Sequence, residues 1–325
     1  MNIALLRQYF FTLFLIAIGW VIVPQAHAAA NITCSTTGTT LSFGTLDPNN
    51  TTDVTGTISF SCTNTGSQGT ASVCYNYAGS AFPLSMTSGG NNLNFTIYAN
   101  SGRTTVWGNT NANWVIGPAV PPLSVPANGS ASGTATIYGR VPGGQTSAAA
   151  GSYSFSFSGA AVQMTVSSGS GNSAPSDCNS SVSQGPVATN VSFNSTATVQ
   201  YVCSVTAPTL NFGSLAQLTS ATNGSTNLSV NCVNLTPYNV GLDAGLNGGG
   251  NVNARKMKLG ASTISYQLYS NSGRTTVWGN TVGTNTVSGI GNGLAQPYTA
   301  YGQVPIQTTP PPGAYTDTVT ISVTY

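Results

Sequence analysis

Cysteines and aspartates are the side chains of this sequence that could carry covalent or acid–base chemistry. The chain has no Glu, and its single His, His27, lies in an N-terminal segment that we expect to be removed. General acid–base catalysis would rest on scattered carboxylates, and no Ser- or Cys-based triad can be assembled without a histidine. We expect no enzyme activity, no catalytic residue, no metal site and no cofactor. The aspartates are Asp47, Asp53, Asp177, Asp243 and Asp317.

The six cysteines predict disulfides, because an even number of cysteines in an exported chain is typical of oxidised pairs. The interval between Cys34 and Cys62 is almost the same as that between Cys203 and Cys232. Each pair brackets a similar segment, so we predict the pairs Cys34–Cys62 and Cys203–Cys232. Cys74 and Cys178 are left over as a candidate extra bridge.

The first 28 residues have the layout of a signal peptide. Arg7 supplies a positive charge, an apolar run follows from Phe10 to Val23, and Ala26-His27-Ala28 fits the small-x-small cleavage rule. The apolar run is about 14 residues, shorter than the roughly 20 that a spanning helix needs. We therefore prefer a cleaved signal peptide, residues 1–28, to an N-terminal anchor helix, and we expect the protein to be exported.

Charge is sparse along the chain. Charged residues make up 4% of the sequence and the formal net charge is +2, whereas 40% of the residues are hydrophobic. Such a chain can build a core but has no basic patch for nucleic acid or for an anionic membrane. The one basic cluster, Arg255, Lys256 and Lys258, is interpreted as the solvated face of a strand.

The chain contains an internal duplication. NSGRTTVWGNT occurs at 100–110 and again at 271–281, and other landmarks keep their order around it. We predict two diverged copies of one domain, at 29–195 and 196–325. The Ser/Gly-rich segment 169–185 precedes this boundary or is itself the linker, and Ala188 to Asn194 could be a last strand that completes the first domain. The further landmark pairs are TLSFGTL (40–46) with TLNFGSL (209–215), IYGRVPGGQ (137–145) with AYGQVPIQ (300–307), and GSYSFSFS (151–158) with GAYTDTVT (313–320).

Alternation of apolar and polar residues predicts strands throughout. GTISFSC, TNLSVNC and the C-terminal TDTVTISVTY each place apolar side chains on one face and Ser, Thr or Asn on the other. Turn pairs such as Asn-Gly and Pro-Pro separate these runs, and no helical stripe follows residue 28. The sequence indicates all-β sandwich domains.

These residues carry a family resemblance. The order Cys–FG–Cys, Tyr266-x-Leu268-Tyr269, WGN, YG-x-VP and PGAYTDTVTISVTY resembles the spore coat protein U domain, found in subunits of archaic (Csu-type) chaperone–usher pili. The match is strong over 200–325 and weaker but ordered over 30–165. It implies tandem immunoglobulin-like sandwiches, the C-terminal one an incomplete pilin fold lacking its last strand. In this family a periplasmic chaperone fills the gap first, and then the N-terminal strand of the adjacent pilus subunit, at an outer-membrane usher.

The resemblance implies a position at the pilus tip. The last alternating strand, Val319, Ile321, Val323 and Tyr325, would bind the chaperone or the incoming strand. Only AANIT lies between Ala28 and Cys34, too little for a donor strand, so the chain is expected to accept a strand without donating one. A two-domain tip adhesin on the cell surface, supporting attachment and biofilm formation, is the predicted function. A non-adhesive pilus adaptor or a cell or spore coat protein is the alternative.

Adhesion would use apolar loops of the first domain that the second domain lacks. After the shared WGNT, the first copy continues with a proline-stiffened apolar run that is unsuited to a central strand. Such tips could bind an abiotic or host surface by burying apolar area. The bland interpretation is that they cover the end of the core. The candidate binding residues are Trp114, Val115, Ile116, Val120 and Leu123, then Tyr77, Phe82 and Leu84, then Ala148 and Ala149.

Overall fold

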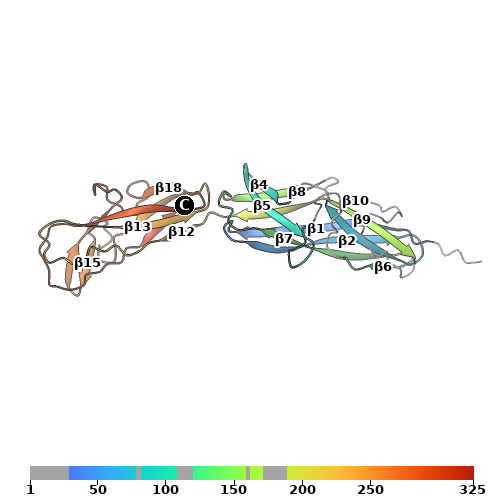
Figure 1. Ribbon diagram of the computed structural model, residues 1–325, viewed down its shortest axis with the longest axis horizontal. Coiled ribbons are helices and arrows are strands. Elements are labelled where there is room, and N and C mark those ends of the chain that lie inside the picture. The colour runs from blue at the N-terminus through green and yellow to red at the C-terminus, as the bar shows by residue number, and fades with distance from the viewer. Residues whose placement is uncertain (1–28, 78–81, 108–119, 159–161, 171–188) are drawn as a thin grey trace, which may run out of the picture.

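A computed structural model of the chain describes residues 29–77, 82–107, 120–158, 162–170 and 189–325. These residues form two all-β domains that lie end to end (Figure 1). Two separate hydrophobic cores correspond to the two domains. No helix of the described residues is long and apolar enough to cross a membrane. The predicted tandem of immunoglobulin-like β-domains is confirmed, and the predicted signal peptide, residues 1–28, lies outside the described residues.

The first domain contains β1 to β11. Seven strands close into a barrel in the order β1-β11-β8-β4-β5-β7-β2, and four form a sheet in the order β10-β9-β3-β6. The bounds are β1 Ile32–Leu46, β2 Thr52–Asn64, β3 Gly69–Tyr77, β4 Leu84–Ser88, β5 Asn91–Tyr98, β6 Leu123–Val125, β7 Ser130–Val141, β8 Gly151–Phe157, β9 Val162–Ser170, β10 Thr189–Asn190 and β11 Phe193–Val199.

The second domain contains β12 to β20. It has a four-stranded sheet β12-β13-β19-β17, a three-stranded sheet β18-β14-β20 and the hairpin β15-β16. The bounds are β12 Cys203–Thr206, β13 Thr222–Cys232, β14 Pro237–Leu242, β15 Lys256–Leu259, β16 Ser262–Ser265, β17 Gln267–Tyr269, β18 Val287–Ile290, β19 Ala295–Val304 and β20 Ile321–Thr324.

The alternating sequences account for these strands. In β2, Ile58, Phe60 and Cys62 are buried while the residues between them are partly exposed, and in β13 Leu228 and Val230 are buried in the same way. Successive side chains of a strand point to opposite faces, so each strand presents its apolar residues to the core. The sequence pattern thus fixes which face of each sheet is buried.

Both predicted disulfides that lie within the described residues are confirmed. Cys34 is bonded to Cys62, which pairs with it in register on the neighbouring strand, and Cys203 is bonded to Cys232 in the same way. Cys74 is also disulfide-bonded, while its predicted partner Cys178 lies outside the described residues. Each domain therefore has a disulfide between its first two strands.

The duplicated NSGRTTVWGNT makes matching contacts in both domains. Trp107 and Trp278 are buried, and their indole N–H groups donate to the carbonyl oxygens of Tyr75 (3.0 Å) and Val240 (2.8 Å). A buried indole needs such a partner, so the tryptophan anchors the loop to the facing strand. The repeat is scaffold rather than a duplicated active site.

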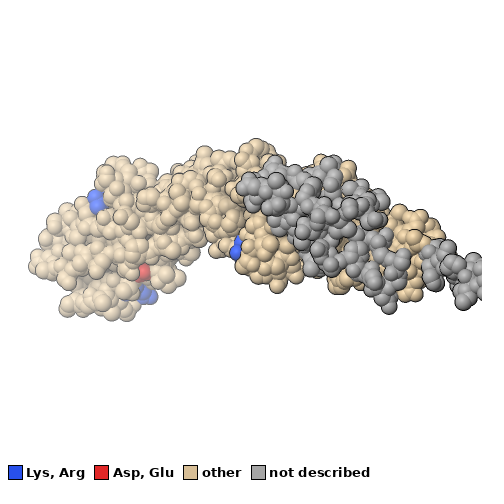
Figure 2. Space-filling view, turned by 45° about the vertical axis from the view of Figure 1, so that its right-hand side comes forward, with Lys and Arg blue, Asp and Glu red and all other residues tan. Residues whose placement is uncertain are grey.

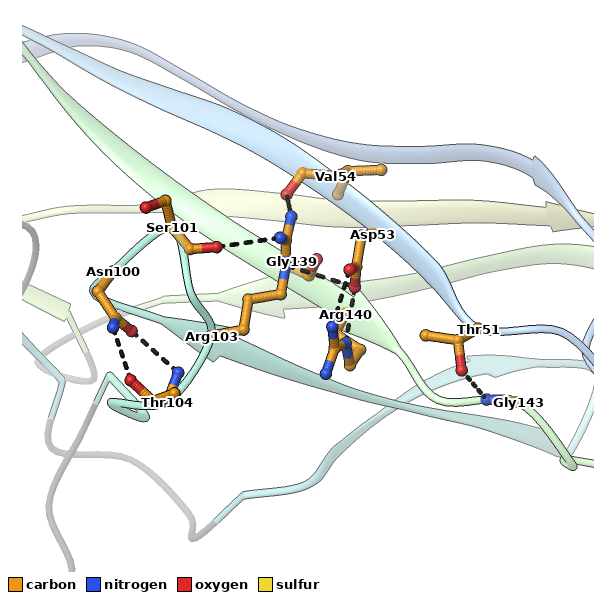
Figure 3. A network of polar contacts seen from close by, with 10 residues as sticks. All are labelled: Thr51, Asp53, Val54, Asn100, Ser101, Arg103, Thr104, Gly139, Arg140 and Gly143. Atoms are coloured by element: carbon orange, nitrogen blue, oxygen red, sulfur yellow. Dashed lines mark hydrogen bonds and ion pairs between the residues drawn. The ribbon is translucent and has the colours of Figure 1, made fainter.

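The arginine of the repeat ties three segments together. Arg103 has a positive φ of 53° and donates to the carbonyl oxygens of Gly139 and Val54 (Figure 3), while its guanidinium lies over the ring of Tyr138. Arg274 also has a φ of 53° and makes the equivalent contacts in the second domain, to Gly302, Gly224 and Tyr301. Each arginine therefore makes its cation–π contact with a tyrosine of a neighbouring strand.

The two domains meet at the turn between β13 and β14. The side-chain amide of Asn234 donates to the carbonyl oxygen of Ser147 (2.8 Å), and Ala149 and Asn234 form a parallel β-bridge. Val233 of this turn packs into the core of the first domain. The chain crosses from β11 to β12 through residues 200–202.

Candidate strand-binding site

In the first domain, β11 lies between β1 and β8. It runs parallel to β1, from Leu41 opposite Ser195 to Leu46 opposite Val199, and antiparallel to β8 along its whole length. Its inward-facing residues are buried: Val199 is 2% exposed and Ser195 is fully buried. The strand crosses the expected boundary at residue 195, and all of its pairing partners lie in the first half of the chain. It therefore completes the first domain from within.

The equivalent position in the second domain has no strand. By the sequence correspondence, it lies between segment 209–215, the counterpart of the end of β1, and segment 313–319, the counterpart of β8. In 189–325, which the structure describes without a gap, β20 pairs only with β14, and residues 207–221 belong to no strand. We call this place the open strand position.

Burial of matched residues reports the difference directly. In the first domain Leu41 is 2% exposed and Leu46 is 7% exposed, whereas Leu215, which matches Leu46, is 37% exposed. Leu210 and Phe212 are only half-buried, unlike their buried counterparts Leu41 and Phe43. The apolar edge of the second domain is thus partly open to solvent, as in a sheet ready to take one more strand.

The predicted strand residues lie in β20 or directly beside it. Val319, Ile321 and Val323 are half-buried against the second core, and Tyr325 is 58% exposed. Val162 and Met164 of β9, the strand of the first domain that corresponds to β20, are fully buried. β20 is itself paired with β14, and the binding of a partner by these residues stays a prediction.

The second domain has a polar network beside the open strand position. The corresponding place in the first domain is apolar. Leu84, Phe95 and Phe155 of the first domain correspond in sequence to Arg255, Tyr266 and Asp317 of the second. Phe95 and Phe155 form an edge-to-face pair with ring centroids 5.7 Å apart. In the second domain the same corner holds a buried cation, a phenol and a carboxylate.

Arg255 is fully buried and is held by four acceptors. Its guanidinium donates to the carbonyl oxygens of Leu242 (2.7 Å), Asp243 (2.8 Å) and Trp278 (2.8 Å), and to Oε1 of Gln267 (2.8 Å). Burial lowers the pKa of the guanidinium, and the nearby phenol and carboxylates oppose that shift. The prediction that Arg255 belongs to a solvated basic face is wrong, because carbonyls from three segments converge on it. Lys256 and Lys258, beside it, are exposed.

Two carboxylates flank this arginine. Asp317 accepts hydrogen bonds from the Tyr266 hydroxyl (2.7 Å), the Leu246 N–H (3.0 Å) and the Asn247 amide (3.0 Å). Burial, followed by the bond to Asp317, raises the pKa of Tyr266, so this hydroxyl stays a donor.

Asp243 is held by the backbone. Burial raises its pKa, but hydrogen bonds from the N–H groups of Gly245 (2.9 Å) and Thr320 (2.9 Å) lower it by more. The carboxylate therefore has a pKa below its ordinary value and links the loop after β14 to the segment before β20.

The predicted binding loops of the first domain are only partly accessible. Tyr77 and Leu84 are buried, at 3% and 4% exposure, because they alternate into the core at the ends of β3 and β4. Ala148 and Ala149 are buried at the junction with the second domain. The prediction that these four side chains form an exposed surface is wrong.

The other predicted binding residues have mixed outcomes. Phe82, Val120 and Leu123 are half-buried and pack against the edge of the first core. Trp114, Val115 and Ile116 lie outside the described residues.

Other chemistry is sparse in the described part of the chain. It contains no group of three or more His, Cys, Asp or Glu side chains that could hold a metal ion. The face shown in Figure 2 carries few charged side chains. The described ion pairs join Asp53 to Arg140 (2.7 Å) and to Arg103 (3.3 Å) at the edge of β2 and β7 (Figure 3).

Sequence reasoning missed the polar network and the full length of β11. A signal for the first exists in the aligned copies GSYSFSF and GAYTDTV, where a phenylalanine is matched by Asp317. A signal for the second is the alternation of Val191, Phe193, Ala197 and Val199, which continues past Asn194.

Comparisons with known proteins agree with the duplication. The Spore Coat Protein U domain matches this chain twice, at residues 22–157 and 189–322. Protein U of Myxococcus xanthus is 38% identical over 108 residues, which are 31% of this chain and 60% of that protein. The chain therefore spans less than two thirds of the length of this curated relative.

The solved structures that match this chain have lower identity. One is the CsuC–CsuE chaperone–tip adhesion subunit pre-assembly complex from archaic Csu pili of Acinetobacter baumannii. It is 20% identical with a TM-score of 0.47 and covers 90% of this chain and 100% of that chain. Another is the CupB6 tip adhesin of Pseudomonas aeruginosa, 10% identical with a TM-score of 0.38, which covers 92% of this chain and 94% of that chain.

Proposed function

Because the chain belongs to the Spore Coat Protein U domain family over both of its halves, we propose that it is a two-domain subunit of an archaic chaperone–usher pilus. Its C-terminal domain accepts an extended strand of the adjacent subunit at the open strand position. One observation carries this proposal: β11 fills in the first domain the place that no strand of residues 189–325 fills in the second.

An added strand would pair the free backbone edge of the second domain and cover its half-buried apolar side chains. An added strand pairs its backbone with both flanking segments and covers the half-buried Leu210, Phe212 and Ile321. Apolar area removed from water contributes about 25 cal/mol per Å². Left uncovered, such an edge invites aggregation. This supports a periplasmic chaperone as the first partner, and the outer-membrane usher as the place where the chaperone is replaced.

The polarity of β11 supports a tip position. Since β11 runs parallel to β1, an incoming strand in the second domain runs parallel to segment 209–215. It starts near the first domain and ends near the hairpin β15-β16, at the far end in Figure 1. The subunit that follows an N-terminal donor strand is then attached at that far end. The first domain projects away from the fibre, at the cell-distal tip.

A first domain at the tip is placed to act as an adhesin. In this proposal Trp114, Val115 and Ile116, with the half-buried Val120 and Phe82 at the core edge, contact an abiotic or host surface and support attachment and biofilm formation. Changing Trp114 and Ile116 to Ser is expected to abolish attachment while pili still form. Val282→Ser, in the loop that follows the repeat in the second domain, is the matched control, since its side chain is 52% exposed but lies in the pilin domain.

A non-adhesive adaptor or coat role is the second candidate. The burial of Tyr77, Leu84, Ala148 and Ala149 favours it, because these side chains cannot bind a surface. Gold labelling of the protein on isolated pili separates the two candidates. One label at a fibre end supports the tip adhesin, and labels within the fibre support the adaptor.

Strand acceptance is tested on the full chain. We append residues 188–200 after Tyr325 through a short flexible linker, because the C-terminus lies where an incoming strand would begin. The appended strand is expected to raise the melting temperature of the second domain and suppress aggregation. A scrambled appendage is the control. Equal melting temperatures for the two would contradict strand acceptance.

A further inference from the structure

Ser195 is an anomaly in β11. Its inward-facing neighbours are apolar, with Phe193 stacked on Phe157 at 4.3 Å between ring centroids. Ser195 is fully buried opposite Phe155, and its hydroxyl has no hydrogen-bond partner among the described residues. A buried hydroxyl without a partner costs about 1–3 kcal/mol in protein stability. The first domain thus tolerates a polar side chain at a register position where its own surroundings offer nothing.

The second domain offers a partner at that same register position. Asp317 stands where Phe155 stands in the first domain, on the segment that an incoming strand would flank. Its carboxylate already accepts three hydrogen bonds, and a carboxylate has about four acceptor sites. Arg255 and Tyr266, the matched replacements of Leu84 and Phe95, make the whole corner polar.

We propose that the strand accepted by the second domain carries a small hydrogen-bond donor, such as Ser, Thr or Asn, opposite Asp317, and that Asp317 thereby sets the register of the strand. This inference rests on the proposed strand acceptance. A large apolar side chain at that position would bury the remaining acceptor capacity of the carboxylate without a donor.

The neighbouring positions explain why one polar contact suffices. Tyr315 and Val319 flank Asp317 on the same face, where Tyr153 and Phe157 flank Phe155. Side chains alternate along a strand, so a slip of two residues moves an apolar side chain onto Asp317 and a slip of one turns the apolar face outward. Only one register places a donor at the carboxylate and apolar residues on both sides.

The appended-strand protein described above tests this directly. In the appended copy of residues 188–200, the residue equivalent to Ser195 is changed to Leu, which adds apolar area but removes the donor. We expect the melting temperature of the second domain to fall by at least about 4 °C relative to the Ser form. The native first domain, which keeps its own β11, gives the internal reference transition in the same calorimetric scan.

Two further variants link the effect to Asp317. With Asp317→Phe, which restores the residue of the first domain, Leu in the appended strand should equal or exceed Ser. With Tyr266→Phe the Ser form should gain a larger advantage, because the carboxylate loses one donor. A Leu form as stable as the Ser form in the unaltered second domain overturns the inference, even where the appended strand itself stabilises. An appended strand that stabilises in no form overturns strand acceptance instead.

Discussion

Phe43 in the first domain and Phe212 in the second occupy the same place in one duplicated sequence, yet Phe43 is 4% exposed and Phe212 is half-buried. β11 pairs with β1 on both sides of Phe43 and has no counterpart beside Phe212. The repeated arginine and tryptophan make the same carbonyl and tyrosine contacts in both domains, so these contacts do not depend on the closing strand. The comparison distinguishes two sets of residues. The repeated arginine and tryptophan stabilise the fold that both domains share, whereas β11 provides the closing strand in the first domain alone.

Phe193→Ala should have the largest effect. Phe193 is 7% exposed and stacked on Phe157, and removing such a core ring costs about 3–5 kcal/mol. Calorimetry should show a lower melting temperature for the first domain and an unchanged melting temperature for the second domain. Phe212→Ala, at the open edge of the second domain, should cost clearly less until a strand is supplied, because Phe212 is only half-buried. Equal losses would mean that the open strand position is closed in solution.

Disulfide removal should affect the two domains alike. Replacing Cys34 and Cys62, or Cys203 and Cys232, by Ser opens loops of 28 and 29 residues. The chain-entropy model gives about 3–4 kcal/mol for either loop. Denaturant unfolding of each variant should therefore show similar losses in the two domains. A much larger loss in the second domain would show that its disulfide supports the unfilled edge as well.

Arg255→Leu should destabilise the second domain by about 3 kcal/mol, because four carbonyl oxygens lose their buried donor and two carboxylates lose a nearby cation. Adding Tyr266→Phe and Asp317→Phe recreates the apolar corner of the first domain and should recover most of this loss, since replacing a whole buried polar set by apolar residues is often neutral. Thermal unfolding checks both variants. A triple variant less stable than the single one would show that the two corners are packed differently.

Lowering the pH should produce the smallest difference in stability between the two domains. The pKa of Asp243 is lowered below its ordinary 3.8, so its contribution to stability is complete above that value and is lost as pH falls through the folded pKa. Asp53 in the first domain has a lowered pKa because Arg140 donates hydrogen bonds to it, and it follows the same sign. Asp243→Asn should flatten the acid dependence of the second transition alone. Loss of the dependence in both transitions would indicate coupled domains.

Much of the fold was readable from the sequence. Strand alternation depends on neighbours along the chain, and the duplicated cysteines constrain one another, so the sheets and the pairs Cys34–Cys62 and Cys203–Cys232 could be predicted. The closing strand was visible only up to Asn194, because the predicted boundary at residue 195 divided it.

The burial of Arg255 in the polar corner could not be predicted from the sequence. No residue next to Arg255 indicates that its side chain is buried, because Lys256 and Lys258 are exposed. Its acceptors come from other segments: Leu242, Asp243, Gln267 and Trp278. The predicted exposure of the apolar loops was wrong for a related reason. Tyr77 and Leu84 fit an exposed loop tip and a buried core equally well by residue type. Only packing between distant segments distinguishes these cases.

The course of β11 has a mechanical consequence. When the second domain is pulled away from the first, tension enters β11 at Val199 and acts along the strand, so the hydrogen bonds to β1 and β8 are loaded in shear together rather than peeled one by one. Beyond residues 200–202 the tension reaches Cys203, whose covalent bond to Cys232 spreads it onto β13. The joint between the domains thus resists traction along the long axis of the molecule.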